Sequence, residues 1–243
     1  MKYLMMGCLL LTGCATTQQN DVDTEQLMGL ADTAFKYGQL SSVKSKIDQV
    51  LEVDPNHPEA KLMKAKVALR EDRPNAAKAL LAELVNAQDE VASESALLLG
   101  RLALDNQDAA SAVQWFEKGL QATPDNAALL NGLGVAKDSL SDFSGAQEYY
   151  RQAIAVAPDN KNFRSNLALS LLLSGDIDEA YNELQPLVSR PEVPDYLQRT
   201  FALVLIAKGQ DDDARNVLLQ FMSEDEVDHD MALLVKQLGE AER

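Results

Sequence analysis

The thiols and imidazoles of this sequence are few and unevenly placed. They belong to Cys8, Cys14, His57 and His229. A thiolate can attack an acyl group, bind a metal or accept a lipid, and an imidazole can act as a general base or a metal ligand. The histidines are far apart in the chain, whereas a catalytic pair must lie within hydrogen-bonding reach. Chemistry at a cysteine near the N-terminus is therefore the strongest candidate.

The sequence has no motif of a common catalytic or nucleotide-binding site. It contains no GxxxxGK[ST] phosphate loop, no GxGxxG, no HExxH and no GxSxG. Acidic residues such as Asp176, Asp178 and Asp211 lie where we expect helices to begin, and a negative charge there complements the helix dipole. We therefore predict that the protein is not an enzyme and needs no metal, no cofactor and no small-molecule substrate.

The first 14 residues predict an export signal that ends in a lipid anchor. Lys2 is followed by an apolar stretch over residues 3–11, which is too short to span a bilayer. The tetrapeptide Leu11-Thr12-Gly13-Cys14 then resembles the lipobox of bacterial lipoproteins. The resemblance implies that residues 1–13 are removed and that Cys14 carries a diacylglyceryl group and an N-acyl chain. These chains would hold the protein firmly to a membrane.

Ala15, which follows the cysteine, resembles the pattern of lipoproteins sorted to the outer membrane. It implies an anchor in the inner leaflet of the outer membrane, with the protein facing the periplasm. Residues 14–23 would then be the lipidated cysteine and a flexible polar tether. Two alternatives are an ordinary secretory signal with an incidental cysteine and a lipobox ending at Cys8. The second would leave too short an apolar stretch.

The charge of the chain limits its partners. Asp and Glu number 38 against 22 Lys and Arg, which gives a net charge of −16. A nucleic acid is held by clustered basic residues, so we exclude it as a partner. The acidic surface has two readings that the sequence does not separate, namely solubility and attraction to a basic partner segment.

A period of about 34 residues runs through the rest of the chain. Pro124-Asp125-Asn126 and Pro158-Asp159-Asn160 are 34 residues apart, and Pro55-Asn56 is a further copy of the same corner. Proline cannot continue a helix, so each corner ends one. Counting from these corners gives six repeats, which are residues 24–57, 58–92, 93–126, 127–160, 161–194 and 195–228.

Within each repeat the pattern of small and large residues resembles the tetratricopeptide repeat (TPR). Small residues recur at positions 8 and 20, as in Gly134 and Ala146, and large ones at positions 7 and 24, as in Leu133 and Tyr150. The resemblance implies two helices per repeat, here called the A helix and the B helix. Glycines at position 15 (Gly38, Gly175 and Gly209) would allow a positive φ in the turn between them.

We therefore predict an all-α TPR solenoid of six helix-turn-helix repeats over residues 24–228. Residues 229–243 are predicted to form a C-terminal capping helix with Ala232, Leu233, Val235 and Leu238 facing inward.

The A helices of TPR proteins line a concave surface, and this surface is the predicted binding site. An apolar floor with a few polar groups suits a peptide from a protein partner. The alternative for each leucine is that it only packs one A helix on the next. The candidate groove residues are Leu97, Arg101, Asn131, Val135, Asp138, Ser165, Asn166, Leu169, Leu172, Arg199 and Leu203.

Several stretches further resemble the TadD family of the tight-adherence (Flp) pilus system. That resemblance implies a non-catalytic outer-membrane lipoprotein that binds proteins in Flp pilus assembly, with pilotin-like support of the secretin. The alternatives are the pilotin of ordinary type IV pili and a periplasmic adaptor for envelope proteases or cell-wall enzymes. The stretches that carry the resemblance are residues 164–171, 175–180, 184–187, 190–194 and 199–205.

Overall fold

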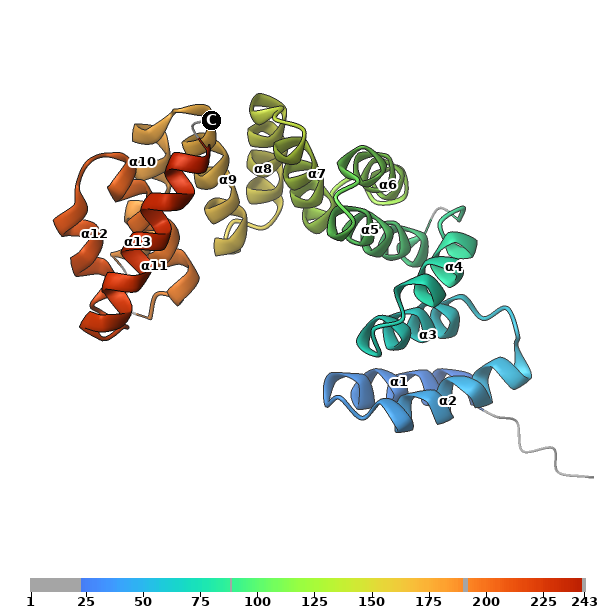
Figure 1. The fold of residues 1–243 in the computed structure, drawn as a ribbon. Helices are drawn as coiled ribbons and strands as arrows, with labels where there is room; N and C mark the ends of the chain where they lie inside the picture. The colour runs from blue at the N-terminus through green and yellow to red at the C-terminus, as the bar shows by residue number, and fades with distance from the viewer. Residues whose placement is uncertain (1–22, 88, 190–191, 242–243) are drawn as a thin grey trace, which may run out of the picture. The chain divides into compact units, whose positions relative to one another are not determined.

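The structure is a computed structural model that describes residues 23–87, 89–189 and 192–241. These residues form thirteen α-helices and, within the described ranges, no β-strand (Figure 1). The prediction of an all-α fold is confirmed. No helix in the described part of the chain is long and apolar enough to cross a membrane.

The first two helices form a compact body of their own, here called the N-terminal hairpin. It consists of α1 (Thr24–Lys36) and α2 (Leu40–Val53). The Asp23 side chain caps α1 by accepting a hydrogen bond from the backbone N–H of Gln26. The core of the hairpin lies between the two helices and contains Ala31, Ala34, Val43, Ile47 and Val50.

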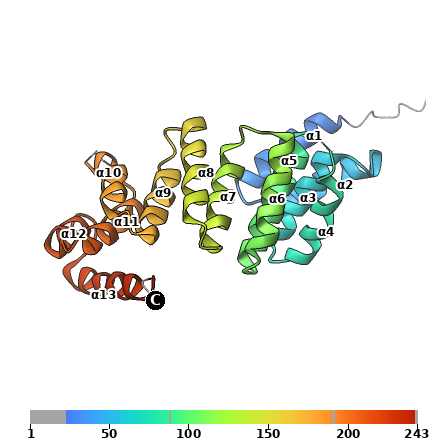
Figure 2. The same ribbon diagram turned by 90° about the horizontal axis from the view of Figure 1, so that it is seen from above.

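The residues from Pro58 onward form the second compact body, here called the main body. In it A and B helices alternate, and each A helix between the first and the last packs on its own B helix and on the B helix before it (Figure 2). The helices are α3 (Pro58–Arg70), α4 (Pro74–Leu84), α5 (Glu90–Asp105), α6 (Ala109–Ala122), α7 (Ala127–Ser139), α8 (Phe143–Val156), α9 (Lys161–Ser174), α10 (Ile177–Val188), α11 (Asp195–Ala207), α12 (Asp211–Leu218) and α13 (Glu224–Ala241).

The turn between the A and B helices has the same backbone conformation in all six repeats. Gly38, Gly175 and Gly209 have the predicted positive φ at position 15. The other three repeats place a residue with a side chain in this left-handed conformation, which is unfavourable for L-amino acids. These residues are Asp72 (φ 55°), Gln107 (φ 59°) and Ser141 (φ 59°).

Small residues at position 8 let the two helices of a repeat approach closely. A Cβ atom added to Gly134 would lie 2.4 Å from the ring of Tyr150, and one added to Gly100 would lie 2.2 Å from the ring of Phe116. Both rings are at position 24 and are at most 1% exposed. The remaining position-24 residues are as deeply buried, so this contact defines the repeat: Ile47, Leu81, Leu184 and Leu218.

The C-terminal helix differs from its prediction in its start and in its buried face. It begins at Glu224 rather than at residue 229. Its buried residues include Val227 and Leu234. Of the residues predicted to face inward, only Leu238 is half-buried; Ala232, Leu233 and Val235 are exposed.

The physical reason for this correction is that the sixth repeat is short. Hydrogen bonds between neighbouring A helices join residues 35 apart, as in Asn131–Asn166 and Ser165–Thr200. The equivalent contact of the next pair, Arg199–Asp230, joins residues only 31 apart. Helix α12 has 8 residues, whereas α8 has 14. The helix that follows is therefore placed as a seventh A helix, four residues earlier than a constant period predicts.

Candidate partner-binding groove

An apolar groove with a volume of about 760 Å³ lies over three successive A helices, α9, α11 and α13. Helix α11 contacts both of the others and forms the middle of the groove. The volume is in the range of sites that hold a ligand or a few side chains of a peptide. The groove is lined by Leu169, Leu172, Leu173, Ser174, Gly175, Ile177, Arg199, Thr200, Leu203, Ala207, Asp230, Leu233, Leu234 and Leu238.

Apolar side chains in this groove remain open to solvent. Leu173 of α9 is 44% exposed and Leu233 of α13 is 46% exposed. The predicted residues Leu169, Leu172 and Leu203 are half-buried between them. Large apolar side chains gathered in an open groove are typical of a binding surface.

One charged pair interrupts the apolar lining. Arg199 Nε lies 3.4 Å from Asp230 Oδ2, and the two side chains are 49% and 11% exposed. Within the described part of the chain, Asp230 Oδ2 is buried and receives no hydrogen bond. A buried carboxylate oxygen without a donor is costly. The pair therefore contributes less to stability than a hydrogen-bonded ion pair would, and it leaves much of the guanidinium open.

Most of the other predicted polar residues form hydrogen bonds between helices. Asn166 Nδ2 donates to Asn131 Oδ1 at 2.8 Å, which joins α9 to α7. Ser165 Oγ and Thr200 Oγ1 are 3.0 Å apart and join α9 to α11. Ser165 is only 4% exposed. The prediction that Ser165 faces an open groove is therefore corrected: its hydroxyl links two A helices.

Asp138 is likewise held by hydrogen bonds between helices. Its carboxylate accepts hydrogen bonds from Tyr150 Oη at 2.8 Å and from Ser170 Oγ at 2.6 Å. Burial raises the pKa of Asp138, and the two hydrogen bonds oppose that shift. Burial and the neighbouring carboxylate also raise the pKa of the Tyr150 hydroxyl, so it stays a donor. Asp138 therefore connects α7, α8 and α9.

The three remaining predicted residues lie away from the groove. Leu97 lines a separate shallow depression with Glu94 and Pro124. Arg101 is exposed, and Val135 packs at the edge of the C-terminal core. Of the eleven predicted residues, the structure therefore brings four into the apolar groove: Leu169, Leu172, Arg199 and Leu203.

The side of the groove that α13 supplies was not predicted as part of the binding surface. Asp230, Leu233, Leu234 and Leu238 all come from this helix. A signal for them was present, because Val227 and Leu234 are spaced by two helical turns and no proline closes the sixth repeat. The constant period of 34 residues concealed that signal.

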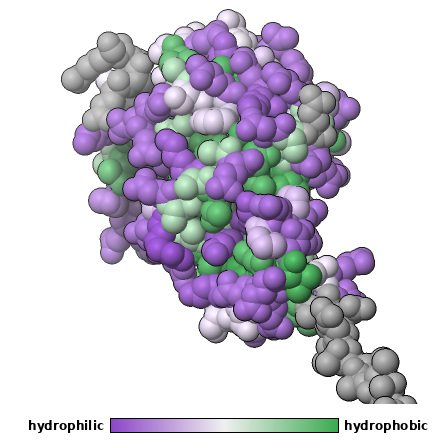
Figure 3. Space-filling model, turned by 90° about the vertical axis from the view of Figure 1, so that its right-hand side faces the viewer, coloured by the Kyte–Doolittle hydropathy of each residue, from purple (hydrophilic) through white to green (hydrophobic). Residues whose placement is uncertain are grey.

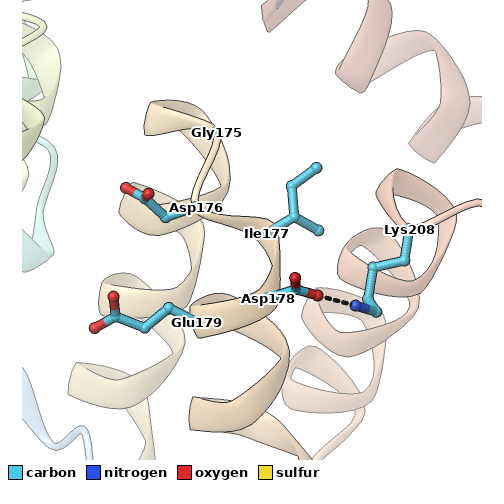
Figure 4. A pocket seen from close by; sticks show the side chains of 6 residues that line it. All are labelled: Gly175, Asp176, Ile177, Asp178, Glu179 and Lys208. Carbon is cyan, nitrogen blue, oxygen red and sulfur yellow. Dashed lines mark hydrogen bonds and ion pairs between the residues drawn. The ribbon is translucent and has the colours of Figure 1, made fainter.

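A second, shallow pocket adjoins the groove at the start of α10, and the two share Gly175 and Ile177. Figure 4 shows Asp178 directed toward Lys208, with which it forms an ion pair, while Asp176 and Glu179 point away from that lysine. Lys208 Nζ also lies 5.2 Å from the centre of the Tyr181 ring.

One face of the molecule shows how polar and apolar side chains are distributed. On the face drawn in Figure 3, polar side chains predominate and apolar ones appear between them in small patches. Across the described residues, no cluster of three or more His, Cys, Asp or Glu could hold a metal ion. Cys14, the predicted signal peptide of residues 1–13 and nearly all of the predicted tether of residues 14–23 lie outside the described residues.

Comparison with known proteins identifies the repeats. Two sequence models of the tetratricopeptide repeat match the chain, over residues 62–127 and 139–198. Together they cover about half of the sequence. No curated protein matches the chain.

Solved structures resemble the chain at low sequence identity. PilW, a widely conserved type IV pilus biogenesis factor, has a TM-score of 0.75 at 16% identity, over 87% of this chain and 98% of its own. PilF of Pseudomonas aeruginosa has a TM-score of 0.69 at 15% identity, over 81% and 89%. A TPR protein of Parabacteroides merdae has a TM-score of 0.63 at 13% identity, over 89% and 86%.

At these identities the likeness establishes the fold. The two sequence matches, the A–B helix pairs and the small-against-large contacts all agree with one another. The chain therefore belongs to the tetratricopeptide-repeat family and has the architecture of a protein-interaction scaffold.

Proposed function

We propose that this protein is a lipid-anchored scaffold of the outer membrane that binds a protein partner in pilus assembly. The observation that carries the proposal is the apolar groove over α9, α11 and α13, where Leu173 and Leu233 stay open to solvent and Leu203 of α11 is half-buried. The partner would bury these leucines, and the cost of leaving them in water would be removed.

Cys14 would hold the scaffold at the membrane. The lipobox-like sequence before it supports a diacylglyceryl group on its thiol and an acyl chain on its amine, with the folded repeats facing the periplasm. The resemblance to the TadD family supports a role in Flp (tight-adherence) pilus assembly. The proposed partner is the pilus secretin, whose localisation or multimerisation the protein would assist in the manner of a pilotin.

Photocrosslinking in cells tests the groove. A photoreactive amino acid placed at Leu203 should crosslink to a pilus-assembly protein, with the secretin as the expected product. The matched control is Val156, which is 45% exposed at the end of the B helix α8 and lies outside the groove. Equal crosslinking from both positions would remove the groove from the proposal.

A double substitution gives the corresponding loss of function. Leu172→Asp with Leu203→Asp should abolish surface pili as a gene deletion does, while the amount of protein stays normal. Val156→Asp is the control and should leave piliation intact. Normal pili in the deletion strain would refute the proposed function itself.

The anchor is tested separately. Cys14→Ser should release a folded protein from the outer-membrane fraction, with the same thermal unfolding as the parent. A variant that still fractionates fully with the membrane would contradict lipidation at this residue.

A second candidate function is that of a pilotin for ordinary type IV pili. Its support is the likeness to PilW, which is named as a type IV pilus biogenesis factor. The two candidates differ in the crosslinked product at Leu203, which would be the secretin of the Flp system or that of the type IV pilus.

A further inference from the structure

We infer that the groove over α9, α11 and α13 binds a cationic amphipathic helix of its partner, with apolar side chains against the leucines and Lys or Arg at both ends. This inference rests on the proposed function and specifies the chemistry of the partner segment. It follows from the charge around the groove, the arrangement of that charge and the length of the apolar lining.

The negative charge of the protein is concentrated in the part of the chain that contains the groove. Residues 174–230 contain 14 of the 38 acidic residues and 4 of the 22 basic ones. This stretch, less than a quarter of the chain, therefore contributes −10 of the net charge of −16. It forms α10, α11, α12 and the first part of α13, of which α11 and α13 line the groove.

Three of the four basic residues of this region are already paired, and the fourth, Arg190, lies outside the described residues. Lys208 forms an ion pair with Asp178, Arg215 with Asp228, and Arg199 with Asp230. The carboxylates of the region are in excess, so its local potential stays negative and attracts a partner of opposite charge.

The acidic groups lie at both ends of the apolar lining. At one end is Asp230, whose Oδ2 receives no hydrogen bond within the described residues. Glu226 lies near it: hydrogen bonds from Ser223 and, more weakly, the charge of Arg199 hold the pKa of Glu226 below its usual value. At the other end the groove adjoins the shallow pocket that Asp176 and Asp178 line (Figure 4). Glu179 also lines this pocket but is paired with Arg151 of α8.

The length of the lining fits a short helix. It extends along α11 from Arg199 to Ala207, which is about 12 Å at the rise of an α-helix. A partner helix of two to three turns would cover it with one apolar stripe at i, i+3, i+4 and i+7. Its first and last basic residues would then reach the two acidic ends.

The charged contact between α11 and α13 supports this assignment. The two preceding contacts of the same kind, Asn131–Asn166 and Ser165–Thr200, are neutral and hydrogen-bonded. Arg199–Asp230 instead places an incompletely satisfied carboxylate beside the leucines. Because Asp230 Oδ2 is itself buried, a cationic group of the partner would stabilise this carboxylate through its charge rather than through a direct hydrogen bond.

Three synthetic peptides of about 18 residues test the inference with the full chain. The first is an amphipathic helix of Leu and Lys, the second replaces every Lys by Glu, and the third has the Leu/Lys composition in a non-amphipathic order. Fluorescence anisotropy should give the Leu/Lys helix at least about tenfold tighter binding than either other peptide. Its affinity should fall as the salt concentration rises.

Substitutions then locate the site. Leu203→Ser should weaken the Leu/Lys helix by about tenfold, and Val156→Ser should leave its affinity unchanged. Asp176→Asn with Glu226→Gln should reduce both the affinity and its salt dependence. Circular dichroism should confirm that each variant is folded.

Two results would overturn the inference. Equal binding of the ordered and scrambled Leu/Lys peptides would mean that only charge is recognised. Tighter binding of the Leu/Glu helix would mean that the partner has the opposite charge. Either result would leave the crosslink at Leu203 intact, so failure of this inference and failure of the proposed function are distinguishable.

Discussion

Repeats 3 and 4 and the C-terminal part of the main body share one framework, the packed residues at positions 8, 20 and 24. They differ in the surface that their A helices leave open. In α5 to α8, glycines lie directly beneath the rings of Phe116 and Tyr150. The polar groups between helices are hydrogen-bonded there, as in Tyr150–Asp138. In α9, α11 and α13 the framework residues are equally buried, but the A helices leave an open apolar groove with the Arg199–Asp230 pair in its wall.

This difference separates two sets of positions in the repeat. Positions 8, 20 and 24 fix how the two helices of each repeat pack, and they hardly vary in burial along the chain. The A-helix positions that face away from the B helix are unconstrained by that packing. They can close a contact between helices, as at Asn131 and Asn166, or line a groove, as at Leu169 and Leu203.

The largest effect is expected where the middle repeats are most tightly packed. Gly134→Leu should lower the free energy of unfolding by about 3 kcal/mol, because its side chain would overlap the Tyr150 ring. Chemical denaturation measures the change. The control is Gly29→Leu on the exposed face of α1, where a Cβ meets nothing within 4 Å. An equal loss at both positions would disprove the assigned repeat positions.

A smaller loss of stability is expected from removing the hydrogen bond between Tyr150 and Asp138. Tyr150→Phe should cost about 1.5 kcal/mol, since the half-buried Asp138 carboxylate would lose one of its two donors. The neighbouring half-buried Tyr149, changed to Phe, is the control and should shift the unfolding midpoint much less. If both variants unfold alike, Asp138 does not depend on this hydrogen bond.

Substitutions at position 15 of the turn can be compared directly between the two regions. Ser141→Gly and Gln107→Gly should raise stability by about 0.5 kcal/mol by relieving the left-handed conformation, partly offset by the greater freedom of the unfolded chain. Gly175→Ala and Gly209→Ala should each lower it by about 1 kcal/mol. Thermal unfolding of all four variants measures both effects. Changes of the same sign in both pairs would contradict a shared turn.

The smallest effect is a dependence on pH. The pKa of Asp138 is raised in the folded state, so the folded state holds its proton more tightly than the unfolded one. Its contribution is therefore most favourable at low pH and is lost as the pH rises through the raised pKa. The stability of Asp138→Asn relative to the parent should improve between about pH 4 and pH 7. A difference that stays constant over this range would indicate an unshifted carboxyl.

The fold could be predicted from the sequence because its determinants are local and repeated. The alternation of small and large residues, with prolines such as Pro124 and Pro158, indicated paired helices before any contact was known. Where position 15 is not glycine, as at Gln107, the residue type did not indicate the left-handed turn, because glutamine rarely adopts a positive φ.

The groove could be predicted only in part. Position in the repeat indicated which side chains lie on the concave face, and Leu169, Leu172, Arg199 and Leu203 do line the groove. It did not indicate which polar side chains find partners on the next helix. Asn131, Ser165 and Asp138 do so through residues of the following repeat, and a single repeat does not reveal those contacts.

The shortened sixth repeat has a consequence for how such a chain can change its length. The missing residues fall in α12 and the turn after it, and α13 begins as a separate helix at Glu224. The rotation of α13 about its axis is therefore set by its own buried residues, Val227 and Leu234, and not by the length of α12. A B helix in this architecture can thus lose residues while the next A helix keeps its contact with the one before it, as Arg199–Asp230 shows.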